Sequence, residues 1–172
     1  LLDLSLPVWL PIGFDYLAIC MFAIAGALLA IEKGYDIVGV FTVAFCSAVG
    51  GGLIRDGIFL QQGPPLITLD GLYLVVIAGS VLFALFLYRF LNRYSFLNQL
   101  NYVIMHLDAM GVGAYAIVGM KKAELAGLAI PAVILVGIIN AIGGGLLRDI
   151  LTREEPWVFR PGQLYVLAVF IG

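Results

Sequence analysis

The chain has 172 residues, of which 63% are hydrophobic and 12% are charged, and its mean hydropathy is +1.10. Because soluble domains carry about 25% charged residues, this composition excludes a soluble domain and predicts an integral membrane protein with about five to seven spanning helices. The net charge of −2 and the dispersed basic residues argue against a nucleic-acid partner.

Apolar runs separated by turn signals predict six helices. Glu32-Lys33-Gly34 marks the end of the first helix, and Pro64-Pro65 separates the second from the third because proline cannot continue a helix. The five complete spans are expected at about residues 15–31, 36–60, 70–91, 102–120 and 125–151. A sixth should start near Gln163, where the remaining ten residues would cover about half of a ~30 Å hydrocarbon layer.

The pattern GGG-x-x-RD occurs twice, at residues 50–56 and again 93 residues later at 143–149. At this offset, residues 36–56 and 129–149 share ten identities in 21 positions, which indicates an internal duplication.

We therefore expect one membrane domain, residues 1–172, built from a first three-helix unit at 14–91 and an incomplete second unit at 102–172. Three helices are an odd number, so the second unit must enter the membrane from the opposite side. The predicted fold is an all-α inverted repeat with a pseudo-two-fold axis in the membrane plane.

The loop charges predict the orientation. By the positive-inside rule, the side with more basic residues is cytoplasmic, which leaves the N-terminus outside. That side carries Lys33, Arg89, Arg93, Arg153 and Arg160, whereas the other carries Lys121 and Lys122.

The two glycine triplets predict kinked or broken second and fifth helices, because glycine is about 1 kcal/mol worse than alanine in a helix. Broken helices meeting near mid-membrane would leave a wet gap, with freed carbonyls for a cation and half-helix N-termini for an anion. The alternative is close helix packing through small residues. The candidate pore and kink residues are Gly50, Gly51, Gly52, Gly143, Gly144 and Gly145.

One turn beyond each triplet stands a charged pair, and we expect these charges near opposite mouths of the pathway. An arginine at membrane depth costs at least ~2.5–3.5 kcal/mol, so it should face a partner or water. Adjacent helical residues point apart, so we expect pairing between the repeats, or capping of freed carbonyls, rather than pairing with the neighbour; a structural ion pair is the alternative. The residues are Arg55, Asp56, Arg148 and Asp149.

Further polar residues have two interpretations each. Lys121 and Lys122 stand where the first repeat has leucines, and they are either gating charges or lysines that snorkel to the headgroups. Ser47 and Asn140 either line a pore or form interhelical hydrogen bonds.

Asp15 and Asp108 are expected to be helix N-caps, and Tyr73 is expected in the interfacial aromatic belt. Cys20 and Cys46 lie in apolar runs without CxxC spacing, so no disulfide framework or metal site is expected. The sequence shows no nucleophile–base arrangement or nucleotide loop, so we expect neither an enzyme nor a resident cofactor.

The duplicated motif in two three-helix units resembles the prokaryotic branch of the trimeric intracellular cation (TRIC) channel family. The same bacterial sequences are grouped under a duplicated membrane domain labelled "glycine transporter". The resemblance implies a homotrimer in a prokaryotic inner membrane, with a pore in each protomer lined by the kinked second and fifth helices and K⁺ or Na⁺ as the permeant ion. It also implies a seventh helix, which this sequence lacks along with part of the sixth.

Two rival functions fit the residues. In a secondary transporter of glycine or another small zwitterion, the same helices would bind a carboxylate at a helix N-terminus and an ammonium at freed carbonyls. In a membrane scaffold, the glycines would serve packing alone.

Overall fold

The computed structural model describes residues 9–61, 64, 66–93 and 99–159, which form helices joined by turns, with no strand among them. Five helices in these ranges are long and apolar enough to span a membrane. The sixth helix predicted from Gln163 lies outside the described residues. The elements in chain order are α1 (Trp9–Glu32), α2 (Ile37–Ile54), the π-helix η1 (Arg55–Leu60), α3 (Leu66–Leu69), α4 (Leu72–Arg93), α5 (Leu100–Leu125), α6 (Ile130–Thr152) and the 3₁₀ helix η3 (Trp157–Phe159).

Two equivalent turns end the first helix of each repeat. Gly34 has φ +74° and Gly127 has φ +77°, a left-handed conformation that glycine adopts without a Cβ penalty. The following amide donates back to the helix in both turns, from Tyr35 to Ala30 and from Leu128 to Ala123. Each turn reverses the chain, so the next helix packs against the one before it.

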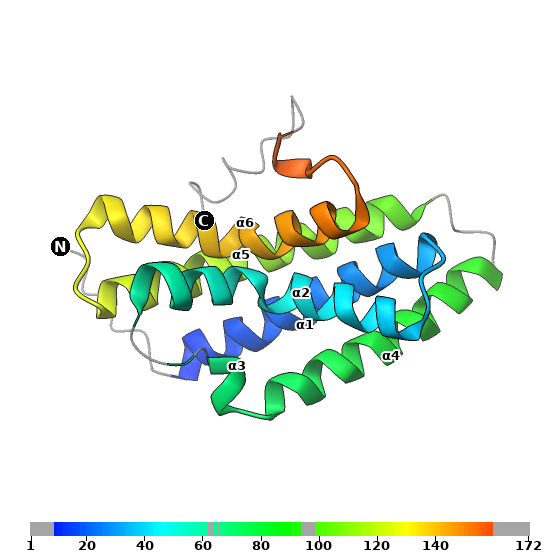
Figure 1. Cartoon of the computed structure of the whole chain (residues 1–172), viewed down its shortest axis with the longest axis horizontal. Helices are drawn as coiled ribbons and strands as arrows, with labels where there is room; N and C mark the ends of the chain where they lie inside the picture. Colours follow the sequence, from blue (N-terminus) through cyan, green and yellow to red (C-terminus); the bar gives the residue numbers. More distant parts are fainter. Residues whose placement is uncertain (1–8, 62–63, 65, 94–98, 160–172) are drawn as a thin grey trace.

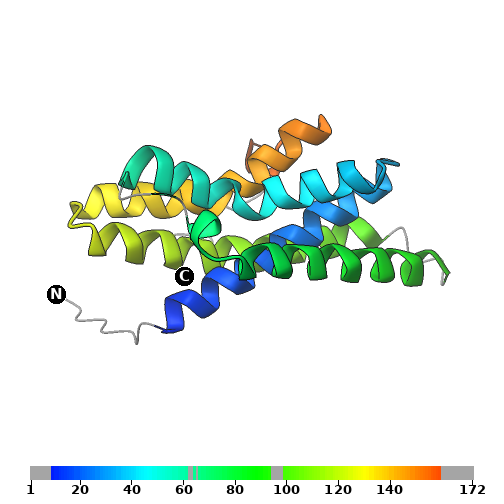
Figure 2. The same ribbon diagram turned by 60° about the horizontal axis from the view of Figure 1, so that its bottom comes forward.

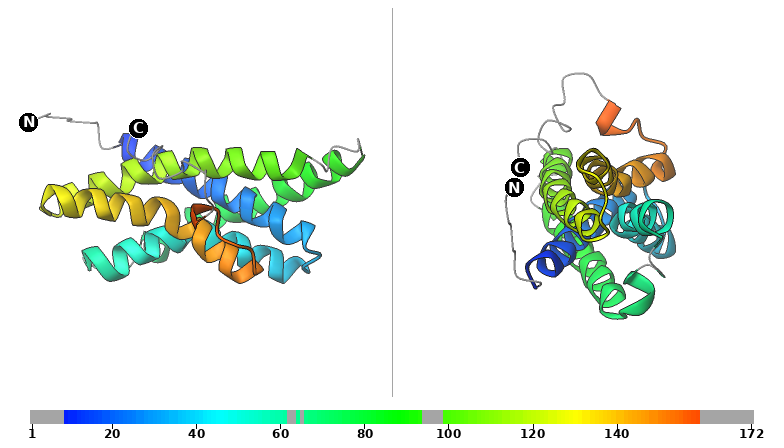
Figure 3. Two further views of the ribbon diagram at one scale, coloured as in Figure 1. Left: turned by 90° about the horizontal axis from the view of Figure 1, so that it is seen from above. Right: turned by 90° about the vertical axis from the view of Figure 1, so that its left-hand side faces the viewer.

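Four helices form a closed ring, in which α1, α2, α6 and α5 each pack against the next, while α4 packs outside against α1. Figure 3 (right) shows this ring end-on, and Figure 2 shows that α1 runs obliquely to the other helices. Buried side chains form the core, among them Phe22, Tyr115 and Ala141 on the ring helices and Ile77 on the inner face of α4. Exposed apolar side chains cover the outer face of α4, which agrees with lipid as the solvent.

The equivalent helices of the two units run in opposite directions. Figure 1 shows α2 antiparallel to α6, and α1 antiparallel to α5. These are the directions that an inverted repeat requires.

The prediction of broken helices was wrong in one respect, because the helix continues through both glycine triplets. Helix α2 is α-helical to Ile54, and the amide of Arg55 donates to the carbonyls of Gly51 and Gly52. Helix α6 continues to Thr152, although Figure 3 shows it changing direction after its triplet. Glycine permits the helical conformation, and interhelical packing compensates for its low propensity.

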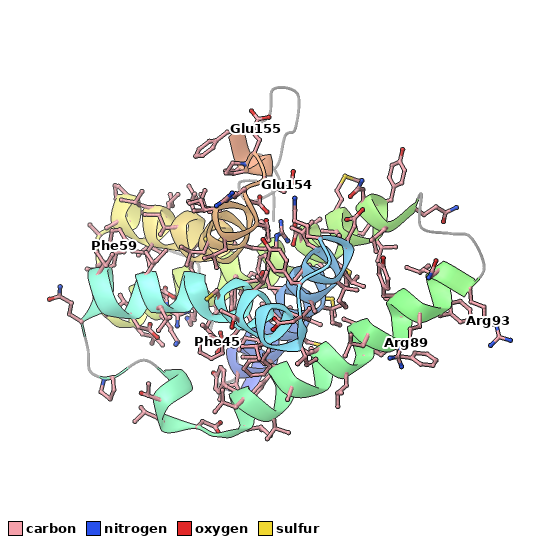
Figure 4. The ribbon with its side chains drawn as sticks, turned by 45° about the vertical axis from the view of Figure 1, so that its right-hand side comes forward. Phe45, Phe59, Arg89, Arg93, Glu154 and Glu155 are labelled. Atoms are coloured by element: carbon pink, nitrogen blue, oxygen red, sulfur yellow. The ribbon has the colours of Figure 1, made fainter. Side chains whose placement is uncertain are left out.

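The predicted grouping of basic residues at two ends agrees with the structure. The Lys33 ammonium donates a hydrogen bond to the Glu154 carboxylate, which joins the end of α1 to the chain just after α6 and raises the pKa of Lys33 above its ordinary value. Arg89 and Arg93 project from the last turns of α4 (Figure 4). Arg160 lies outside the described residues, and the side of the membrane that each end faces stays a prediction.

Candidate functional site

The first two glycines of each triplet form the contact between α2 and α6. A Cβ at Gly51 would collide with the backbone carbonyl oxygen of Asn140, and one at Gly144 would collide with that of Ser47. A Cβ at Gly143 would come within 2.9 Å of the Gly51 Cα. The wet gap predicted at this crossing is therefore not there, because the backbones touch. The packing interpretation holds for Gly50, Gly51, Gly143 and Gly144.

The third glycine of each triplet has a different surrounding. A Cβ at Gly52 would find its nearest neighbour, the Arg55 Nη2, at 3.6 Å. A Cβ at Gly145 would find Phe22 at 3.9 Å and the Arg148 Nη2 at 4.0 Å. Gly52 and Gly145 therefore lie beside the arginine side chains rather than in the helix contact.

Arg148 is buried between two carboxylates. Its Nη1 donates to Asp108 Oδ1 at 2.6 Å, and its Nε donates to Asp149 Oδ1 at 2.8 Å. Arg148 and Asp149 are 1% and 2% exposed. Both carboxylates are needed here, because an unpaired arginine in this setting would be costly.

Two predictions about these residues were wrong. Arginine and the adjacent aspartate do pair, because the rule that adjacent residues diverge concerns Cβ directions and the long arginine side chain folds back. Asp108 is no N-cap, since α5 begins at Leu100, two turns earlier.

A cavity of about 30 Å³ lies beside Arg148, enough for one or a few water molecules. Asp108, Arg148 and Asp149 supply its polar wall, so with both carboxylates ionised its net formal charge is −1. Its apolar wall includes Phe22 and two residues that follow α6, Pro156 and Val158.

Arg55, the equivalent of Arg148, has a different set of partners. Its Nε and Nη2 donate to the two oxygens of Asp56 at 2.6 and 2.9 Å, and its Nη1 donates to Asn140 Oδ1 at 3.2 Å. The bond to Asn140 links the two repeats, but it is a hydrogen bond to a neutral amide and not the pairing of charges between repeats that we predicted. Asp56 is less buried than Asp149, with a side chain 14% exposed.

Asn140 and Ser47 are both fully buried but differ in their bonds. Asn140 bridges the repeats, because its Oδ1 accepts from Arg55 in the first repeat while its Nδ2 donates to the Tyr115 carbonyl of the second at 2.6 Å. The Tyr115 hydroxyl donates to the Ala48 carbonyl at 2.5 Å. Ser47 Oγ has no hydrogen-bond partner among the described residues.

Sequence reasoning missed Tyr115 and its repeat equivalent Phe22, whose rings pack with centroids 5.5 Å apart. Their signal was available, since the two aromatic residues are 93 positions apart. It was hidden because Phe and Tyr are not identical.

Asp15 and Tyr73 form a second missed contact. Asp15 lies inside α1, which begins at Trp9, so the predicted N-cap role was wrong. Its carboxylate accepts a hydrogen bond from the Tyr73 hydroxyl. Tyr73 is 6% exposed, so its ring packs inside the bundle and does not face lipid.

The adjacent lysines have separate surroundings. Lys121 pairs with Glu124 at 2.8 Å, near the end of α5. The Lys122 Nζ lies 3.8 Å from Asp56 Oδ2, so this lysine reaches the Arg55 cluster rather than snorkelling away from it.

The family described as "Glycine transporter" matches residues 12–89 and 105–172, most of the chain. The chain belongs to the glycine transporter family. Two curated members of this family are similar along most of the chain. A UPF0126 membrane protein of Deinococcus radiodurans is 35% identical over 159 residues, covering 92% of this chain and 71% of its own length. The UPF0126 inner membrane protein YadS of Escherichia coli K12 is 34% identical, with coverages of 92% and 73%.

Solved TRIC channels share the fold of this glycine transporter family member, which confirms the predicted resemblance. The TRIC trimeric intracellular cation channel orthologue from Rhodobacter sphaeroides superimposes with a TM-score of 0.83 at 31% identity, over 92% of this chain and 78% of its own. A prokaryotic TRIC channel in 0.5 M KCl gives 0.83 at 30% identity, with coverages of 94% and 79%.

Proposed function

We propose that this protein is a monovalent cation channel selective for K⁺, assembled as a homotrimer in a prokaryotic inner membrane with its N-terminus outside. The observation that carries the proposal is the pair of buried charge clusters on either side of the α2–α6 crossing, in a chain with the fold of TRIC cation channels. Each protomer would hold its own pathway along α2 and α6.

The structure changes the expected route of that pathway. Because the first two glycines of each triplet are in backbone contact, we place the route on the side of Gly52 and Gly145, where the arginines lie. Both guanidinium groups are neutralised by carboxylates, which removes the repulsion that a free arginine would exert on a cation. With both carboxylates ionised, the net formal charge of −1 at the cavity favours cations over anions.

A second candidate is transport of glycine or a related zwitterion, which the description of the family favours. A zwitterion needs a donor for its carboxylate. Arg148 is the donor nearest the cavity, but each of its three guanidinium nitrogens already has a carboxylate partner. A bound carboxylate would have to displace Asp108 or Asp149, so the geometry supports the channel better.

Purified full-length protein in a planar bilayer under a K⁺ gradient tests the proposal. We expect unitary current steps whose reversal potential follows the K⁺ gradient. Saturable glycine uptake into proteoliposomes without current steps would overturn the channel and establish the transporter. If folded protein shows neither activity, the result would overturn both proposals and favour a membrane scaffold.

Lys122 is the stronger gating-charge candidate of the two lysines, because it lies at the Arg55 cluster. Full transfer of one charge is worth ~2.3 kcal/mol per 100 mV. Lys122→Gln should therefore make open probability less steep with voltage, and Lys121→Gln should not. Equal slopes in single-channel recordings of both variants and the unchanged protein would contradict a sensing role for Lys122.

A further inference from the structure

The side chains of Arg55 and Arg148 are equivalent in the repeat but have different partners. Arg148 is held by charged partners on two helices, with Asp108 on α5 and Asp149 on α6. Among the described residues, Arg55 forms its ion pair with its neighbour Asp56, and its other hydrogen bond is a longer one, 3.2 Å, to the neutral Asn140 amide. A hydrogen bond from arginine to a carboxylate joins two opposite charges, whereas the Asn140 acceptor carries no charge. The Arg55 side chain is therefore held less strongly than that of Arg148.

Arg55 also has an alternative partner nearby. Asp15 is the repeat equivalent of Asp108, and α1, which carries it, packs against α2. In the second repeat the equivalent pair is bonded at 2.6 Å. In the first repeat the Tyr73 hydroxyl donates to Asp15 instead.

The backbone differs at the same place. The residues from Arg55 to Leu60 form a π-helix, whereas their equivalents continue α6 as an α-helix to Thr152. A π-helical segment carries more residues per turn than an α-helix, and such segments are common at functional sites. A return to α-helix would rotate the Arg55 segment relative to its neighbours. The second repeat shows that an equivalent sequence adopts that form.

We propose that Arg55 is the moving element of the gate, exchanging its bond to Asn140 for one to Asp15. The Asn140 bond links α2 to α6 beside the crossing and opposes their separation. Bonding to Asp15 on α1 releases that link and gives the first repeat the arrangement already present in the second. The Tyr73 hydroxyl competes for Asp15 and favours the observed arrangement. This inference rests on the proposed channel function.

Single-channel recordings of three variants of the full-length protein test the exchange. Tyr73→Phe frees Asp15 and should raise the ratio of open to closed time at least tenfold. Asp15→Asn removes the charged acceptor and should lower that ratio at least tenfold. The double variant should behave like Asp15→Asn, since Tyr73 acts only through that carboxylate. Unitary conductance should stay unchanged in all three.

Two matched controls separate gating from folding. Tyr16 packs against Tyr73, but its hydroxyl bonds Asp70 and not Asp15. Tyr16→Phe removes that hydroxyl and should leave the ratio unchanged. Asp108→Asn weakens the ion pairing of Arg148. It should lower the thermal unfolding temperature and change the ratio of open to closed time by less than tenfold.

The exchange is wrong if Tyr73→Phe and Asp15→Asn shift the ratio in the same direction, or if neither shifts it in folded protein. A purely structural role predicts the first of these outcomes. Failure of the channel function itself looks different, because the unchanged protein would then show no unitary current.

Discussion

Alanine at Gly51 or Gly144 is expected to destabilise the bundle, whereas alanine at the adjacent Gly52 or Gly145 should be tolerated. The first pair would place a Cβ against backbone carbonyls of the facing helix. Backbone atoms in a packed helix cannot retreat as a side-chain end can, so α2 and α6 must move apart. Overpacking costs about 1–3 kcal/mol, and we expect the upper end. Thermal unfolding of purified protein in detergent measures it.

The adjacent glycines are the matched controls. At Gly52 the new Cβ has its nearest neighbour at 3.6 Å, and at Gly145 at 3.9 Å, which are ordinary contacts. Alanine is also the better helix former by about 1 kcal/mol, so these variants should unfold at the same temperature as the unchanged protein or higher. Equal unfolding temperatures for Gly51→Ala and Gly52→Ala would refute the backbone contact. Permeation is best tested with a larger residue at Gly52, since the protein should still fold.

Arg148→Met should destabilise the protein more than Arg55→Met, although the two positions are equivalent in the repeat. Loss of Arg148 removes the guanidinium that pairs with the buried carboxylates of Asp108 and Asp149, and breaking a buried pair in this way costs about 3–5 kcal/mol. Loss of Arg55 leaves Asp56, which is partly exposed and has Lys122 at 3.8 Å. Unfolding temperature and the yield of monodisperse protein are the measurements.

Two further variants check the cause. Adding Asp108→Asn to Arg148→Met removes one of the buried negative charges that paired with the arginine, so it should restore part of the lost stability. Arg148→Lys should restore little, because a compact ammonium lacks the guanidinium fork that reaches both carboxylates. If Arg148→Met and Arg55→Met lose equal stability, the two arginines contribute equally to the stability of the fold and the prediction is wrong.

The failures of sequence reasoning share a cause at particular residues. Asp15 and Asp108 were placed at helix starts because each precedes an apolar run, yet both helices begin earlier and bury these carboxylates. The sequence leaves Lys122 with two interpretations, because α5 alone does not reveal that the π-helix after α2 lies beside this lysine. In each instance the deciding partner lies on another helix.

The sequence by itself determined the membrane environment, the duplication and the opposite directions of the two units. Apolar content decides the solvent of a chain, and a repeated motif with an odd number of spans follows from the order of residues alone. Only the tertiary structure decided that two glycines of each triplet pack while the third lies beside an arginine, and that the two arginines are held unequally. Those outcomes depend on distances of a few ångströms between helices, which spacing along one helix does not contain.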